Sequence, residues 1–176
     1  MHIVGAGQEA TKISYMRNGG KGSVFQFGKR YDMATTTPIS NCSIIKLEID
    51  GENKGSDYTT STTTNMESTG VVAYSCENFL AEDLFIHDCN GYGVGLEGTG
   101  SPNRNNQVVN RCTIYRVTHD GVDMKGGMGT AIVSNCYINP NQTARITLSF
   151  KENRFGNYVG NVGSNGKTNT NWTNHK

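Results

Sequence analysis

A short stretch of the chain, residues 119–125, combines one imidazole, two carboxylates and one amine. Groups of these types perform general acid–base catalysis when they are held within reach of the same substrate atom. Glu97 and Arg145 offer a further carboxylate and a further cation elsewhere in the chain. Two chemistries fit these groups: hydrolysis of a glycosidic bond by paired carboxylates, and β-elimination from a uronic acid by a base that a cation assists.

Alternation of apolar and polar residues predicts the strand that carries these groups. Val122 and Met124 are apolar, while Asp123 and Lys125 follow them in turn. Side chains on a strand point alternately to its two faces. We therefore expect Asp123 and Lys125 to face outward if Val122 and Met124 face the core.

This strand belongs to an internal repeat. Residues 78–98 align without a gap on residues 106–126, at a constant offset of 28, and a third copy follows at an offset of 24 that places Ile146 on Val122 and Leu148 on Met124. A partial fourth copy lies upstream, where Asn41-Cys42-Ser43-Ile44 matches residues 111–114 and Gly70-Val71-Val72-Ala73 matches residues 121–124. The apolar pairs of the first alignment are Leu80/Val108, Leu84/Cys112, Ile86/Ile114, Cys89/Val117, Val94/Val122 and Leu96/Met124.

Repetition with this period and without helical periodicity predicts an all-β fold, a right-handed parallel β-helix built as a solenoid of coils of about 20–28 residues. We expect coils over residues 1–155, with a Thr-rich loop at 57–69, and a polar coil or tail over 156–176. We also expect the solenoid to be incomplete at one or both ends. A β-sandwich is the alternative, and it would need antiparallel hairpins. The five cysteines lack disulfide or zinc spacing, so buried free thiols are expected, with Cys42, Leu84, Cys112 and Cys136 in one inward ladder.

Stacked coils would gather the polar groups into an outward patch. Strands stack at about 4.8 Å, and a diagonal pair such as Glu97 and Asp123 would have Cα atoms roughly 8 Å apart, which leaves room for an attacking water. The expected neighbours are Gly95 and Thr147 for Asp123, and Glu97 and Ser149 for Lys125. The patch comprises Tyr74, Glu97, Asp123 and Lys125, with the turn residues Tyr92, His119 and Asp120 beside it.

Structural interpretations of the same residues remain open. Glu97 and Lys125 would also form an ordinary surface ion pair, and Asp120 would also serve a turn before Gly121. Adjacent residues on a strand point to opposite faces, so His87 and Asp88 are not expected to form a pair.

The opening His2-Ile3-Val4-Gly5-Ala6-Gly7, followed by Ala10-Thr11-Lys12-Ile13, together with the repeat, resembles the pectin-lyase-like superfamily of parallel β-helices, which includes pectinases, alginate-modifying enzymes and phage tailspikes. Residues 119–127 are similar to the "DDCIxIKSG" coil of polygalacturonase-type glycoside hydrolases. By that resemblance Asp120 takes the place of a catalytic carboxylate. His119 stands where the first Asp of that motif would be, and Tyr92 stands where the preceding coil would supply another.

The resemblance and the patch together imply a hydrolase or lyase that cleaves an extracellular polysaccharide, as part of a phage tailspike or a larger secreted depolymerase. A non-catalytic structural or receptor-binding segment of a tailspike or adhesin is the alternative, and a sugar epimerase using His119 or Tyr92 is a third. The expected catalytic residues are Glu97, His119, Asp120, Asp123 and Lys125, and the expected substrate-binding residues are Tyr74, Tyr92 and Arg145.

Composition bounds the partners and the location. Sixteen Lys and Arg against fifteen Asp and Glu give a net charge of +1, which supplies no general attraction to nucleic acid or to a membrane. No apolar run approaches the roughly 18 residues of a membrane span, and the opening residues do not form a signal peptide. We expect an extracellular or virion-associated protein that binds polysaccharide, whose solenoid ends are capped by a second copy or by partner chains. No cofactor and no metal site is predicted; calcium binding stays open, although no calcium-loop motif supports it.

Overall fold

The computed structural model describes residues 1–15, 22–28, 39–53, 68–97, 106–125, 130–139, 148–150, 155–159 and 162–163. All regular structure in these ranges is β, and the predicted all-β class is confirmed. The described part of the chain contains no helix long and apolar enough to cross a membrane.

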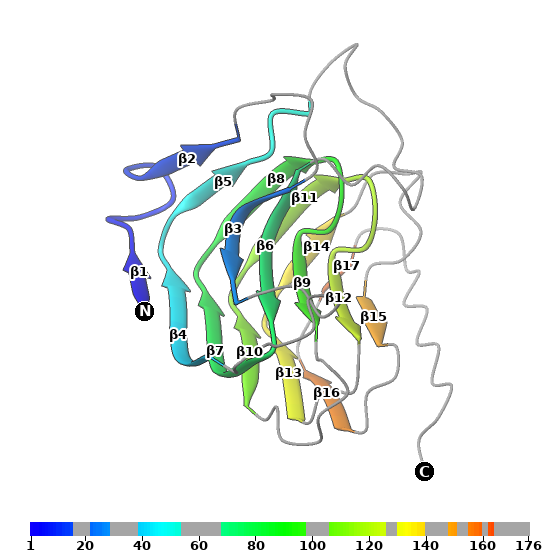
Figure 1. The fold of residues 1–176 in the computed structure, drawn as a ribbon. Helices are drawn as coiled ribbons and strands as arrows, with labels where there is room; N and C mark the ends of the chain where they lie inside the picture. Colours follow the sequence, from blue (N-terminus) through cyan, green and yellow to red (C-terminus); the bar gives the residue numbers. More distant parts are fainter. Residues whose placement is uncertain are drawn as a thin grey trace.

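The strands form three sheets in which every neighbouring pair is parallel (Figure 1). Sheet A has the order β1 (His2–Val4), β4 (Ile39–Ile45), β7 (Cys76–Glu82), β10 (Gln107–Asn110), β13 (Thr130–Ser134) and β16 (Phe155–Val159). Sheet B has the order β2 (Lys12–Ser14), β5 (Glu48–Asp50), β8 (Phe85–Cys89), β11 (Thr113–Val117), β14 (Tyr137–Asn139) and β17 (Val162–Gly163). Sheet C has the order β3 (Ser23–Phe27), β6 (Thr69–Tyr74), β9 (Val94–Glu97), β12 (Val122–Lys125) and β15 (Leu148–Phe150).

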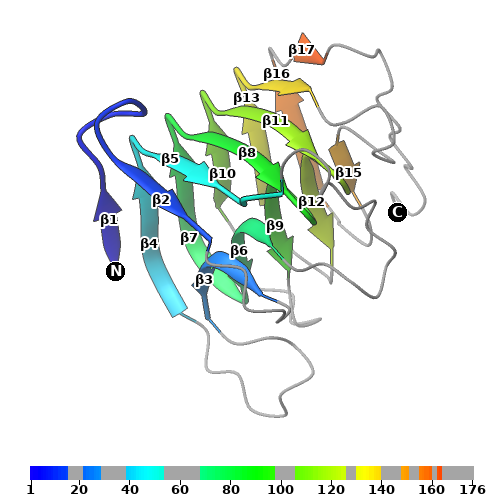
Figure 2. The same ribbon diagram turned by 90° about the horizontal axis from the view of Figure 1, so that it is seen from above.

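The chain visits the three sheets in rotation, so each strand pairs with the one three places further along (Figure 2). We call three consecutive strands, one in each sheet, a circuit. The inward side chains of successive circuits pack into one hydrophobic cluster. Strands β16 and β17 continue sheets A and B beyond residue 155. Fully buried members of this cluster include Ile44, Ile49, Val71, Ile86, Leu96, Ile114, Met124 and Ile138.

The repeat predicts most of the register. Val94 pairs with Val122 and Ile86 with Ile114, as the offset of 28 requires. The next offset of 24 is confirmed in sheets A and B, but in sheet C Leu148 pairs with Val122 rather than with Met124. The predicted position of Leu148 is therefore wrong by two residues. A shift of two keeps apolar side chains on the same face, so alternation alone does not distinguish the two registers.

One predicted ladder position is also wrong. Cys42 lies in sheet A opposite Phe79, and Leu47 takes the place beside Leu84. The Phe85 amide donates to the Leu47 carbonyl (3.1 Å). The sequence match was local, whereas the ladder is set by where the chain turns from sheet A to sheet B. The inward ladder is therefore Leu47, Leu84, Cys112 and Cys136, and all five cysteines are free and buried.

The turn from sheet A to sheet B is made by one left-handed residue in each of four circuits. These residues are stacked, and the side chains of Asp83 and Arg111 meet in a bidentate ion pair of 2.8 and 2.9 Å. The predicted loop over 57–69 extends too far, because Ser68 is buried and Thr69 begins β6; residues 57–67 lie outside the described ranges. The left-handed residues are Lys46, Asp83, Arg111 and Asn135, with φ of 59°, 52°, 50° and 53°.

Candidate functional site

Three of the residues predicted to form the outward patch lie in one row across sheet C. Tyr74, Glu97 and Lys125 are register partners across β6, β9 and β12. Asp123 pairs with Gly95 on one side, as expected, but with Ser149 on the other. The predicted pairing of Ser149 with Lys125 is therefore wrong, because the register of β15 is shifted by two residues, as it is for Leu148.

The outer face of sheet C is buried at β9 and β12, whereas Gln26 on β3 is exposed. Asp123 is 1% exposed and Glu97 is 5% exposed. A methyl group built on Gly95 would lie 3.5 Å from Tyr92 Cδ2 and 3.6 Å from Val72 Cγ2, so these two side chains pack on the same outer face. Tyr74 is half-buried, while Thr147, Arg145 and the side chain of Lys125 lie outside the described part of the structure.

His119 and Asp120 form a buried pair beside Tyr92. The rings of Tyr92 and His119 meet edge to face with centroids 4.6 Å apart. His119 Nδ1 lies 3.2 Å from Asp120 Oδ2. Among the described residues, neither His119 Nδ1 nor Asp120 Oδ1 has a hydrogen-bond partner. Buried polar atoms are rarely left unsatisfied, so each such atom requires an explanation, and a catalytic role is one of them.

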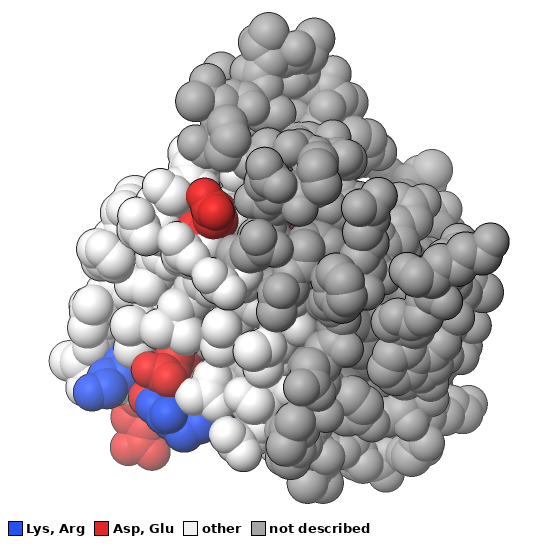
Figure 3. All heavy atoms as spheres, turned by 90° about the horizontal axis from the view of Figure 1, so that it is seen from below, with Lys and Arg blue, Asp and Glu red and all other residues white. Residues whose placement is uncertain are grey.

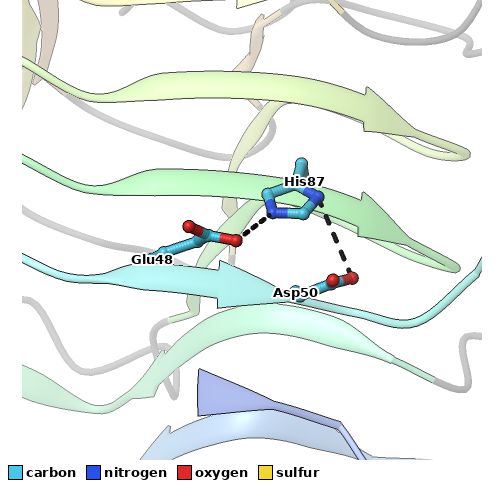
Figure 4. A group of neighbouring side chains, drawn as sticks. All are labelled: Glu48, Asp50 and His87. Atoms are coloured by element: carbon cyan, nitrogen blue, oxygen red, sulfur yellow. Dashed lines mark hydrogen bonds and ion pairs between the residues drawn. The ribbon is translucent and has the colours of Figure 1, made fainter. Parts of the chain in front are cut away.

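A second polar cluster lies on the outer face of sheet B, where sequence reasoning predicted no site (Figure 4). Glu48 and Asp50 flank the buried Ile49 on β5, so both side chains leave the core on the same side. His87 stands opposite Asp50 on β8. Its Nε2 lies 3.0 Å from Glu48 Oε1, and its Nδ1 lies 3.8 Å from Asp50 Oδ1.

Asp88 joins this cluster through an unusual backbone conformation. His87 Nδ1 lies 2.7 Å from Asp88 Oδ2, although adjacent strand residues were expected to point apart. That expectation is wrong because Asp88 has a left-handed φ of 55°, which breaks the alternation and returns Cys89 to the core. Arg116, at the equivalent place on β11 with φ 48°, donates to Asp88 Oδ2 at 2.6 Å.

Lys12 completes a row of alternating charges across β2, β5, β8 and β11. Its Nζ lies 2.8 Å from Asp50 Oδ2 and 3.1 Å from Glu48 Oε1. Aromatic rings lie beside the row: Phe85 stacks on His87 with centroids 4.6 Å apart, and the Arg116 guanidinium lies 5.1 Å from the Tyr115 ring centroid. Both signs of charge are balanced within a few ångströms.

The neighbouring charges shift the pKa values of His87 and Glu48. Burial disfavours the imidazolium of His87, but the hydrogen bonds with Asp88 and Glu48 and the charges of Asp50 and Asp88 outweigh it, so the pKa of His87 is raised. Burial likewise opposes the charged form of Glu48, yet His87 and Lys12 lower its pKa. His87 and Glu48 therefore each favour the charged form of the other.

The described surface on the face drawn in Figure 3 carries no broad field of one sign. Most of it is uncharged, basic and acidic side chains gather side by side at the lower left, and a separate acidic group lies above them. Mixed charge of this kind gives little long-range steering. Recognition at either cluster therefore depends on local contacts.

Comparisons with protein-family models, with curated proteins and with solved structures gave no match for this chain.

Proposed function

We propose that the chain is a right-handed parallel β-helix of the pectin-lyase-like class and that it cleaves an extracellular polysaccharide at the His119–Asp120 pair. The rotation of the chain through three parallel sheets supports the architecture. The observation that carries the activity is the buried pair of His119 and Asp120 beside Tyr92, in which His119 Nδ1 and Asp120 Oδ1 have no hydrogen-bond partner within the described ranges.

The geometry favours proton abstraction by His119. Asp120 lies beside Nδ1 and would orient the imidazole and stabilise its protonated form. Nε2 would then take the proton next to the carboxylate of a uronic acid, while the glycosidic oxygen departs and a carbon–carbon double bond forms. Lys125, opposite Glu97 in register, is the cation that would stabilise the developing charge.

Burial places a condition on this proposal. His119, Asp120 and Asp123 are shielded in the protein alone, so a substrate must open the outer face of sheet C when it binds. Exclusion of water would then strengthen the electrostatic interactions within the site.

A panel of acidic and neutral polysaccharides tests the activity, with reducing ends and the ultraviolet absorbance of unsaturated uronates followed together. A lyase produces both signals. His119→Asn and Asp120→Asn should each lower the rate by about 100-fold or more. His2→Asn, which changes an exposed histidine on β1, serves as the matched control and should leave the rate unchanged.

Reducing ends without ultraviolet absorbance would instead mean hydrolysis, in which Asp120, Asp123 and Glu97 are the acid and base candidates. Silence from a folded chain across the whole panel would refute cleavage.

The second candidate is a non-catalytic structural or receptor-binding segment of a tailspike or adhesin. The burial of the predicted catalytic side chains favours it, because a solvent-shielded set does not meet a polymer directly. Exposed apolar side chains lie instead on and beside the first two strands, at Met1, Val4 and Ile13. We infer that a second copy or a partner chain covers this end, in an extracellular or virion-associated setting.

A further inference from the structure

We propose that Glu48, Asp50 and His87 form a binding site for a divalent transition-metal ion on the outer face of sheet B, with Zn²⁺ and Mn²⁺ as the matching ions. The site is separate from the His119–Asp120 pair and does not depend on the proposed activity. Figure 4 shows the three side chains converging from two neighbouring strands.

The donor atoms already lie close together. One ligand atom from each of the three residues lies within 4.8 Å of the other two. Ligands of a zinc ion sit about 2.0–2.2 Å from the metal, which puts the ligand atoms about 3–3.6 Å from one another. The separation of 3.0 Å between Glu48 Oε1 and His87 Nε2 is at the short end of that range. Asp50 Oδ1 lies 3.8 Å from the other ring nitrogen, Nδ1, so the Asp50 carboxylate must move toward Nε2 to share the ion.

The set of donors selects the kind of ion. Carboxylate oxygens suit Mg²⁺, Ca²⁺ and Mn²⁺, whereas imidazole suits Zn²⁺ and its neighbours in the first transition row. Two carboxylates with one imidazole therefore match Mn²⁺ and Zn²⁺ better than Ca²⁺, which prefers six to eight oxygen ligands.

Asp88 supplies an independent observation. A histidine that binds a metal through one ring nitrogen almost always donates its other N–H to a carboxylate or carbonyl. His87 has this arrangement, because Nε2 faces Glu48 and Nδ1 faces Asp88 Oδ2. Asp88 is 1% exposed, and its Oδ1 has no hydrogen-bond partner among the described residues. A carboxylate buried in this position is a suitable outer partner for a metal-bound imidazole.

The contacts of Lys12 show that Glu48 and Asp50 already hold a positive charge between them. Its ammonium contacts both Glu48 and Asp50, the two carboxylates that would bind the ion. The Lys12 side chain is 44% exposed, so it can withdraw into water when a doubly charged ion replaces it. Lys12 is therefore a competitor for the site rather than a ligand.

Substitution of Lys12 distinguishes a metal site from a purely structural ion-pair network. Lys12→Met keeps all three ligands and removes the competing charge, so metal affinity should rise several-fold. A purely structural network predicts the opposite behaviour: Lys12→Met would lower stability and no stoichiometric metal binding would be found.

The experiment uses the full chain without an affinity tag, freed of metal by a chelator. Zn²⁺ binding is measured by calorimetry, Mn²⁺ by the loss of the free-ion paramagnetic resonance signal, and Ca²⁺ is the contrast. We expect one ion per chain. Asp50→Asn and His87→Gln should each weaken binding at least 10-fold, and Asp88→Asn should weaken it by about 10–100-fold.

Matched controls remove carboxylates from a different ion-pair cluster. Glu82→Gln and Asp83→Asn, which contact Arg111, should leave affinity unchanged. Absence of stoichiometric binding by both ions, or equal affinity in wild type, Asp50→Asn and His87→Gln, would overturn the proposal. If the ligand variants fail to fold, a Lys12→Met variant that binds no tighter than wild type would overturn it as well.

Discussion

Arg116 on β11 donates a hydrogen bond to the buried carboxylate of Asp88 on β8, with 2.6 Å between Nη2 and Oδ2. Both residues have left-handed backbone conformations at equivalent places in successive circuits. The paired irregularity turns both side chains to the outer face of sheet B, where Asp88 also meets His87. One backbone feature thus joins the ion pair to the candidate metal site.

Loss of the Asp88 carboxylate should destabilise the protein. Asp88→Asn keeps a residue that tolerates a left-handed φ but removes the charge that Arg116 and His87 share on Asp88. We expect a loss of about 1–3 kcal/mol in the free energy of unfolding, moderated because the Arg116 side chain is 48% exposed. Urea unfolding of Asp88→Asn, Arg116→Gln and the double variant would measure the coupling; additive effects would show that the two side chains do not interact.

The Asp83–Arg111 pair should make a small, pH-dependent contribution to stability. Hydrogen bonding to the Arg111 guanidinium outweighs burial and lowers the pKa of Asp83. Because the folded-state pKa is depressed, the contribution is present above the unfolded pKa and is lost as pH falls through the folded one. Solvent screens this pair because the Arg111 side chain is half exposed, so the contribution is small. Arg111→Met should raise the Asp83 pKa in an NMR titration; an unchanged titration would contradict the pairing.

Burial should protect the cysteines in the folded protein, although hydrogen bonding with Cys112 lowers the pKa of Cys136. All five are free and buried, and burial is the main cause that raises the pKa of Cys89 and of Cys112. The thiolate is the reactive form, so a thiol reagent should label native protein very slowly and label five thiols after denaturation. Rapid labelling under native conditions would show that the core is open.

Gly93 and Gly95 should respond differently to an added methyl group. At Gly93 a Cβ would lie 2.5 Å from Ile114 Cγ2 and 2.6 Å from the Gly121 carbonyl oxygen, so Gly93→Ala should cost about 1–3 kcal/mol. At Gly95 the nearest atom would be 3.5 Å away, so Gly95→Ala should change stability by less than about 0.5 kcal/mol. Thermal unfolding of the two variants provides the comparison, and equal effects would contradict the register of sheet C.

The chain should associate through the end formed by its first circuit. Strands β1, β2 and β3 each lie at an edge of their sheet in the described structure, and unpaired edges promote association. Multi-angle light scattering should show a species larger than one chain. Val4→Lys with Ile13→Lys should shift it toward the monomer, since both side chains are exposed apolar groups. A wild-type chain that is monomeric at high concentration would refute this interface.

Part of the architecture could be predicted because it depends on local alternation. Val94 and Val122 share an inward position because their segments repeat at a constant offset, and the structure confirms that pairing. The same reasoning placed Leu148 two residues away from its partner, because a strand moved by two residues buries the same face.

The sequence alone determined the strand-rich class, the inward positions on β8, β9, β11 and β12 and the buried state of the thiols, because apolar alternation and burial free energy act along short segments. In sheet A the alternation misled, since Ala81 and Val109 face the core and the aligned apolar pair Leu80 and Val108 does not. Only the tertiary structure brought Glu48, Asp50 and His87 together, since β5 and β8 are separated by dozens of residues and are aligned by backbone pairing within sheet B. It also decided that Asp88 lies beside His87, because a left-handed φ reverses the direction that strand alternation assigns to the side chain.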